Sequence, residues 1–368
     1  MKKNIFYALV ILATIISHSI YADHLLKCNS KVFIHGYHDN YTQPLLNILK
    51  KFNINYEQTS MFDNNDALYI IFDAHQLNKK DFPQHYIIYQ TLDLSGAYLT
   101  SDYNEKLSNA IAVWDYNSSN INHYRHLYNY YYFPANYEYA DPVILPCFLP
   151  TRALDSYKQM LIYSNQKDTD ISSHIPALFT YTLLLNPNLI VEAGVRGGQS
   201  TKPFYQALQL CSATMIGLDI EPSYAAAYNA LKNTLFIHMD DLNFVNYYQN
   251  SDYKNTPIDL IFIDTSHLYE HTLAEIKMFV PLLNTQGIIA FHDSNVTPLP
   301  NHSFMRINGT TDSAPGNTRG VTQALKEYFA LEFNEHYYVN TTFIKDGNTW
   351  HMVHYPFCNG LTFLQKRN

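Results

Sequence analysis

The stretch from Leu189 to Thr201, LIVEAGVRGGQST, decides how the second half of the chain folds. A short apolar run ends in an acid, a turn with three glycines follows, and residues 201–211 then form a possible helix. A glycine-rich turn between a strand and a helix brings backbone N–H groups close to a ligand at the helix N-terminus. We therefore predict a buried strand over residues 189–193 that opens a ligand-binding α/β domain.

Further apolar segments alternate with possible helices after this turn. We expect strands over 214–220, 235–239, 258–264 and 287–292, and helices over 270–283 and 321–330. Near-continuous apolar strands separated by helices indicate a parallel sheet with helices on both faces. The last apolar segments follow one another at the short spacing of antiparallel hairpins, over 338–344, 349–354 and 361–365. The predicted fold is α/β: a Rossmann-like, doubly wound sheet with an antiparallel C-terminal ending.

The first half of the chain predicts a smaller α/β domain of unknown role. Short apolar strands alternate there with possible helices, over 31–35, 67–72, 86–90 and 110–114. Three prolines between residues 141 and 150 indicate an extended connector. We therefore divide the chain into a targeting segment over 1–22, an N-terminal domain over 23–150 and a second domain over 151–368.

The first 22 residues resemble a secretory signal. Lys2 and Lys3 precede an apolar run over 5–16, and a short polar stretch then ends at Ala22. This predicts an exported protein, periplasmic or secreted. The apolar run is short for a bilayer span, which needs about 20 residues. An uncleaved membrane anchor is the alternative, and the segment is then the only predicted membrane contact.

Composition narrows the class of partner. Lys and Arg number 24 against 32 Asp and Glu, a net charge of −8, which excludes a general nucleic-acid-binding protein. Hydrophobic residues make up 47% of the chain, enough for a large core. The four cysteines, Cys28, Cys147, Cys211 and Cys358, form no C-x-x-C pair, and the sequence leaves both their pairing and the oligomeric state open.

The glycine turn has the spacing E-x-G-x-x-x-G-x-S, which is neither a P-loop nor a G-x-G-x-x-G fingerprint. It resembles motif I of the class I S-adenosylmethionine (SAM) methyltransferases. The resemblance implies that the turn surrounds the methionine end of SAM, through Glu192, Gly194, Gly197, Gly198 and Ser200. It also implies that Asp219 accepts hydrogen bonds from the ribose. Asp240 is the acid expected to contact adenine, with Asp241 as its rival.

Polar residues cluster where two predicted strands end, in Asp264-Thr-Ser-His267 and in His292-Asp293. Carboxyl ends of neighbouring parallel strands meet at one edge of a sheet, where ligands bind. We predict Asp264, His292 and Asp293 as ligands of a divalent cation, Mg²⁺ or Mn²⁺, with His267 as the general base. The imidazole of His292 is softer than a carboxylate and favours Mn²⁺, Fe²⁺ or Zn²⁺ over Mg²⁺.

The segments IDLIFIDTSHLYEHTLAEIKMFVPLL and GIIAFHDSN resemble one branch of these methyltransferases. That branch includes cephalosporin hydroxylase-like proteins and metal-dependent macrolide-sugar O-methyltransferases. The resemblance implies an enzyme that methylates a hydroxyl of a small molecule or saccharide. The branch often has Glu-Asp where this chain has His292-Asp293. No D-P-P-Y or N-P-P-Y follows the strand before Asp264, so an amino group of a nucleic-acid base is not the expected acceptor.

Two other functions stay open. His267-Leu-Tyr-Glu270-His271 has the H-x-x-E-H spacing of an inverted zinc peptidase, although it begins at a strand end. This is the remote alternative. SAM is made in the cytosol, so export of the chain would separate it from its cofactor. A non-catalytic binding module with the SAM-binding fold is therefore the second alternative.

Overall fold

The computed structural model describes two compact units, residues 1–165 and 166–368. The described stretches are 32–38, 42–51, 55–63, 67–83, 85–91, 94, 99–115, 120, 130–132, 151–166, 169–295, 303–305, 311–313, 320–356 and 358–367. The predicted signal and the proline-rich connector lie outside them. The sequence predicted a division after residue 150, whereas helix α5 (Thr151–Gln166) falls almost wholly within the first unit. No helix in the described stretches is long and apolar enough to cross a bilayer.

The first unit contains a parallel sheet with the strand order β2-β1-β3-β4-β5-β6. Its strands are β1 (Val32–His35), β2 (Tyr56–Thr59), β3 (Leu68–Phe72), β4 (Tyr86–Gln90), β5 (Ala112–Asp115) and β6 (Tyr130–Tyr132). Besides α5 it contains helices α2 (Thr42–Lys51) and α3 (Ser101–Asn109). Strands β3 and β4 are buried along their whole length. The predicted small α/β domain is therefore present, with β2 and β6 as strands that the sequence did not predict.

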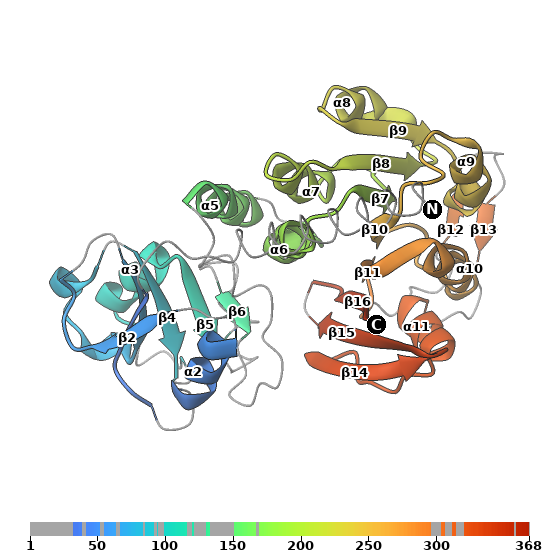
Figure 1. The fold of residues 1–368 in the computed structure, drawn as a ribbon. Helices are drawn as coiled ribbons and strands as arrows, with labels where there is room; N and C mark the ends of the chain where they lie inside the picture. The colour runs from blue at the N-terminus through green and yellow to red at the C-terminus, as the bar shows by residue number, and fades with distance from the viewer. Residues whose placement is uncertain are drawn as a thin grey trace, which may run out of the picture. The chain divides into compact units, whose positions relative to one another are not determined.

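The second unit is built on a sheet with the order β14-β15-β16-β11-β10-β7-β8-β9 (Figure 1). Five strands are parallel: β7 (Leu189–Ala193), β8 (Thr214–Asp219), β9 (Thr234–His238), β10 (Ile258–Ile263) and β11 (Leu283–His292). The antiparallel ending consists of β14 (Val339–Lys345), β15 (Asn348–Tyr355) and β16 (Leu361–Arg367). The predicted doubly wound sheet is confirmed. Its strand order reverses between β7 and β10, which is where such sheets bind ligands.

Helices cover both faces of this sheet. Figure 1 shows α6 (Ile175–Leu185) and α7 (Thr201–Leu208) on one side, and α9 (Phe244–Asn250), α10 (Tyr269–Phe279) and α11 (Val321–Phe329) on the other. The short helix α8 (Ala225–Asn229) precedes β9, and β12 (Ser303–Met305) pairs with β13 (Thr311–Ser313). Helix α10 ends earlier than predicted because Pro281 lies in the 3-10 turn η7 (Val280–Leu282) that follows. Proline has no N–H to continue a helix.

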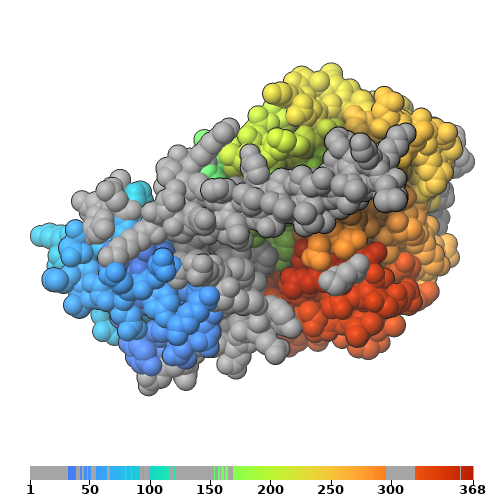
Figure 2. Space-filling view, viewed as in Figure 1, coloured from blue at the N-terminus to red at the C-terminus, as the bar shows by residue number. Residues whose placement is uncertain are grey.

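The core of the second unit joins distant parts of the chain. Helix α6 is buried from Ile175 to Leu183, and Tyr181 stacks on Phe363 of β16 with ring centroids 3.8 Å apart. A helix that is apolar all round is a buried one. In Figure 2 orange and red atoms, which come from separate parts of the sequence, adjoin one another in this unit. Strand β16 pairs with β11 there. Cys211 and Cys358 are free, and Cys28 and Cys147 lie outside the described residues.

Candidate active site

The turn after β7 passes directly over the end of β10. Gly194 has φ +88°, and a Cβ added to it would lie 2.0 Å from the carbonyl oxygen of Asp264. Gly198 has φ +73°, and its Cβ would lie 2.3 Å from the ring of Tyr224. Only glycine fits at these two positions. Gly197 is less constrained, because its Cβ would meet only the flexible side chain of Gln199.

Asp219, at the end of β8, holds this turn in place. Its Oδ2 accepts hydrogen bonds from the backbone N–H groups of Val195 at 2.8 Å and Arg196 at 2.6 Å. Its Oδ1 accepts one from the N–H of Glu221 at 2.8 Å. Asp219 also lines the cavity beside the turn, where the sequence predicts contact with the ribose. The structure thus gives this carboxylate an anchoring role that the sequence did not predict.

Glu192 lies beneath the turn rather than in the cavity wall. It is fully buried, and it accepts hydrogen bonds from the hydroxyls of Ser200 at 2.5 Å and Thr201 at 2.9 Å. Burial raises the pKa of Glu192 to about 8, although both hydrogen bonds act in the opposite direction. Glu192 and Ser200 therefore fix the first turn of α7, which positions the glycine turn above them.

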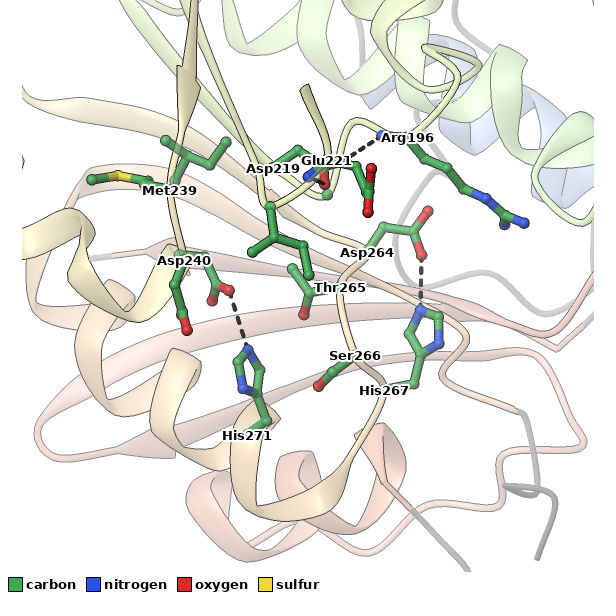
Figure 3. A pocket seen from close by; sticks show the side chains of 14 residues that line it. Arg196, Asp219, Glu221, Met239, Asp240, Asp264, Thr265, Ser266, His267 and His271 are labelled. Carbon is green, nitrogen blue, oxygen red and sulfur yellow. Dashed lines mark hydrogen bonds and ion pairs between the residues drawn. The ribbon is translucent and has the colours of Figure 1, made fainter. Parts of the chain in front are cut away.

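A cavity of about 450 Å³ opens at the carboxyl ends of β7–β10 (Figure 3). That volume is typical of sites for small molecules and cofactors. Of the predicted cofactor residues, Gly194, Asp219 and Asp240 line it. Asp240 also caps the 3-10 turn η6 (Asp241–Asn243), where its Oδ1 accepts a hydrogen bond from the N–H of Leu242 at 3.1 Å. Gly197 lines a neighbouring cavity instead.

The four predicted catalytic and metal-binding residues meet at the ends of β10 and β11. His267 Nε2 lies 3.0 Å from Asp264 Oδ1 and 3.0 Å from Asp293 Oδ2. His292 Nδ1 lies 3.2 Å from Asp264 Oδ1 and 3.3 Å from Asp293 Oδ1. Figure 3 shows Asp264 and His267 facing one another across the end of β10. The sequence prediction that these side chains converge is therefore met.

Two residues of this cluster have a backbone conformation that favours glycine. His267 has φ +59° and Asp293 has φ +54°. Gly320 packs on the carbonyl oxygen of His267 so closely that an added Cβ would lie 1.6 Å from it. Non-glycine residues in the left-handed region cost about 1–3 kcal/mol each and gather at functional sites. In this conformation the side chains of His267 and Asp293 contact each other at the strand ends.

The pKa values of Asp264, His267 and His292 depend on one another. Burial alone would lower the pKa of His267, but hydrogen bonds to Asp264 and Asp293 outweigh burial and raise it to about 10. Burial likewise opposes ionisation of His292, yet the charge of Asp264 raises its pKa to about 9. Burial would raise the pKa of Asp264, but the charge of His292 and hydrogen bonds from both histidines hold it well below its ordinary value. At neutral pH both imidazoles therefore favour the protonated form beside the ionised Asp264.

The three predicted metal ligands fit a divalent cation. Asp264, His292 and Asp293 present ligand atoms within 4.8 Å of one another. Asp293 Oδ1 is buried and accepts no hydrogen bond from any described residue. Two carboxylates with one imidazole form a donor set for Mn²⁺, Fe²⁺ or Zn²⁺, and Mg²⁺ also binds such carboxylates.

The structure divides the H-x-x-E-H sequence between two clusters. His267 contacts Asp264 and Asp293, whereas His271 Nε2 lies 3.2 Å from Asp241 Oδ1 and 3.7 Å from Glu275 Oε1. Glu270 is exposed. A zinc peptidase requires both imidazoles at one metal centre, whereas here they lie in two separate clusters. Sequence reasoning missed the Asp241–His271–Glu275 group; the i, i+4 spacing of His271 and Glu275 on α10 was the signal for it.

A second residue that sequence reasoning missed is His174, at the start of α6. Its ring packs edge-on against the ring of His292, with centroids 5.4 Å apart and an interplanar angle of 78°. Its Nε2 lies 3.0 Å from the carbonyl oxygen of Cys358. The packing of His174 therefore restricts the orientation of the His292 ring. Nothing in the sequence pattern links the start of this helix to the strand end.

A family model described as a methyltransferase domain matches residues 191–294 of this chain. No curated protein matches the chain significantly. The match spans β7 to the residues just after β11, and so includes the glycine turn and the Asp264 cluster.

Solved structures also resemble this chain. SAH-bound PaMTH1 of Podospora anserina is 16% identical, with a TM-score of 0.35, over 60% of this chain and 89% of that one. An O-methyltransferase from Bacillus cereus in complex with SAH is 13% identical, with a TM-score of 0.36, over 58% and 91%. MycE from the mycinamycin pathway, in complex with Mg, SAH and mycinamycin VI, is 14% identical, with a TM-score of 0.38, over 61% and 60%. Such low identities and TM-scores assign no activity to this chain.

Proposed function

We propose that this chain is a class I SAM-dependent methyltransferase that transfers a methyl group from SAM to a hydroxyl oxygen, assisted by a divalent cation. The methyltransferase-domain match over residues 191–294 supports this class. The family match agrees with the predicted methyltransferase domain. The oxygen acceptor and the metal assistance are the proposal, and they rest on the convergence of Asp264, His267, His292 and Asp293 beside the Gly194 turn.

The residues of the chain have separate tasks in this reaction. When bound, SAM supplies an electrophilic methyl group, and a cation held by Asp264, His292 and Asp293 lowers the pKa of the acceptor hydroxyl. His267 would take the hydroxyl proton at Nε2 as the methyl group is transferred from sulfur to the acceptor oxygen. Because Asp264 and Asp293 raise the pKa of His267, its imidazole becomes a base only when another positive group engages these carboxylates.

A second cavity supports a hydroxyl-rich acceptor. It has a volume of about 410 Å³ and is lined by polar groups and the glycine turn, through Thr169, Asp170, Arg196, Gly197 and Gln199. Arg196 lines both this cavity and the first, so the two cavities are neighbours. We propose a small molecule or a saccharide as the acceptor, because hydroxyl, amide and charged groups bind sugar hydroxyls through hydrogen bonds.

The cellular compartment of the protein is part of the same proposal. The N-terminal signal predicts export, with a membrane anchor as the alternative, and it lies outside the described residues. In an exported protein, SAM binding without turnover would favour the binding module over the enzyme. Measuring S-adenosylhomocysteine (SAH) affinity and turnover on the same preparation separates these two functions.

The experiment measures SAH formation from SAM with a panel of catechol and saccharide acceptors. His267→Ala is expected to slow turnover by about 10²–10⁴-fold, the usual contribution of a general base, while SAH affinity stays unchanged. Asp264→Asn is expected to lower both turnover and Mn²⁺ affinity, because it removes a carboxylate charge. Exposed His336→Ala is the matched control. Full activity of Asp264→Asn in excess chelator would show that no cation takes part.

A further inference from the structure

A second group of metal-ligating side chains lies in the wall of the first cavity. Asp241 belongs to η6, after β9, and His271 and Glu275 lie one turn apart on α10. All three are buried, and they present ligand atoms within 4.8 Å of one another. Asp241 and His271 line the cavity, so the group is accessible to a solute that enters there. In Figure 3, His271 lies on the opposite side of the cavity from His267.

The two carboxylates of this group are buried side by side. Asp241 is 7% exposed and Glu275 is 0% exposed. Burial and the charge of Asp241 raise the pKa of Glu275 well above its ordinary value. Among the described residues, no N–H or O–H group donates a hydrogen bond to Asp241 Oδ2 or Glu275 Oε2. Buried oxygens left without a donor are costly, so a cation bound between the two carboxylates would stabilise this pair.

The spacing of the group fits one ion. His271 Nε2 lies 3.2 Å from Asp241 Oδ1 and 3.7 Å from Glu275 Oε1. Ligand atoms bonded at about 2.0–2.2 Å to a tetrahedral ion stand roughly 3.3–3.6 Å apart. The Thr265 hydroxyl donates a hydrogen bond to Glu275 Oε1 at 2.6 Å. Outer contacts of this kind orient the carboxylate ligands of metal sites.

We propose that Asp241, His271 and Glu275 form a second divalent-cation site, separate from Asp264, His292 and Asp293. One imidazole and two carboxylates are a donor set for Zn²⁺ or Mn²⁺, with water completing the coordination from the cavity. The ion neutralises the buried carboxylates and ties η6 to α10 across the cavity wall. A proton shared by Asp241 and Glu275 is the competing occupant, because it neutralises one carboxylate without an ion.

The test counts bound ions in the full-length protein after removal of metal with a chelator. Calorimetric titration with Zn²⁺ is expected to find two sites in the parent. Glu275→Gln keeps the size of the side chain and is expected to weaken the proposed site by at least about 10–100-fold. Asp264→Asn is expected to weaken the other site and leave this one. Glu270→Gln, an exposed neighbour on the same helix, is the matched control.

The outcomes distinguish the ion from the shared proton. X-ray absorption of Asp264→Asn loaded with one Zn²⁺ is expected to show one imidazole nitrogen among oxygen ligands, and adding His271→Gln to this variant is expected to remove that nitrogen. The proposal is overturned if Glu275→Gln binds two ions as tightly as the parent, or if the parent binds one ion that Asp264→Asn abolishes. If circular dichroism shows that Glu275→Gln does not fold, Asp241→Asn replaces it in the Zn²⁺ titration. The X-ray absorption spectrum then serves as the second test of the site. No methyl acceptor enters the titration, so its outcome does not depend on the proposed reaction.

Discussion

At the turn after β7, the backbone rather than a side chain requires glycine. Gly194→Ala places a Cβ at φ +88° and 2.0 Å from the Asp264 carbonyl oxygen. We expect the free energy of unfolding to fall by at least about 1–3 kcal/mol, and SAH affinity to fall with it. Gly197→Ala is the control, because its Cβ meets only Gln199. Denaturant unfolding and SAH titration measure both effects. Identical behaviour of the two variants would contradict the prediction.

The residues of the candidate site differ in how far the sequence predicts them. Asp264, His267, His292 and Asp293 were predictable because carboxyl ends of parallel strands meet at one sheet edge. The anchoring role of Asp219 was not, because it depends on backbone N–H groups whose direction is set by the fold. The left-handed conformations of His267 and Asp293 also lack a sequence signal, since glycine is the residue that normally marks such positions.

Among the elements, apolar patterning predicted most of the strands. β7, β8, β10 and residues 287–292 of β11 are mainly apolar runs that are largely buried. The first part of β11 is polar and partly exposed, and the sequence did not predict it. Strand β2 was missed because its sequence, YEQT, has no such run and it is largely exposed at the sheet edge. An apolar sequence pattern predicts buried strands. A partly exposed edge strand forms because it pairs with its neighbour, and its own sequence carries little signal.

A hydrogen-bonded group at the amino ends of the strands allows stability to be tested apart from binding. Asp259 accepts hydrogen bonds from the backbone N–H and side-chain amide of Asn188, at 2.6 and 3.1 Å, and from the amide of Asn284, at 2.7 Å. It thus joins the starts of β7, β10 and β11. We expect Asp259→Ala to lower the free energy of unfolding by roughly 1.5–3 kcal/mol.

The same variant is expected to bind SAH like the parent, because the cavity lies at the opposite ends of these strands. Exposed Asp252→Ala is the control for loss of a surface charge. Denaturant unfolding and calorimetry measure the two quantities. A loss of SAH affinity in Asp259→Ala without a loss of stability would contradict the separation of the two ends.

For the molecule as a whole, the Asp264 cluster links stability to pH. Burial would lower the pKa of His267, but its hydrogen bonds to Asp264 and Asp293 raise it from 6.5 to about 10. A raised folded-state pKa stabilises the fold fully below the unfolded value of about 6.5. That stabilisation disappears as pH rises through the folded value. In chelator, the parent is therefore expected to lose stability between about pH 7 and pH 10.

His267→Gln is expected to reduce this loss without abolishing it, because His292 keeps a pKa of about 9 in the parent cluster. Exposed His336→Gln is the control and is expected to retain the full loss. Denaturant unfolding at a series of pH values gives the free energies. Parallel curves for the parent and His267→Gln would show that the imidazole does not carry the linkage.

The position of β16 has a consequence for the nascent chain. This strand follows all the others in the sequence, yet it lies inside the sheet between β11 and β15. At a synthesis rate of about 5–20 residues per second, roughly ten seconds or more separate emergence of α6 from that of β16. During this interval the apolar surface of α6 has no Phe363 to cover it, and β11 presents an unpaired edge. We therefore expect ribosome-bound chains to expose an aggregation-prone surface until β16 emerges.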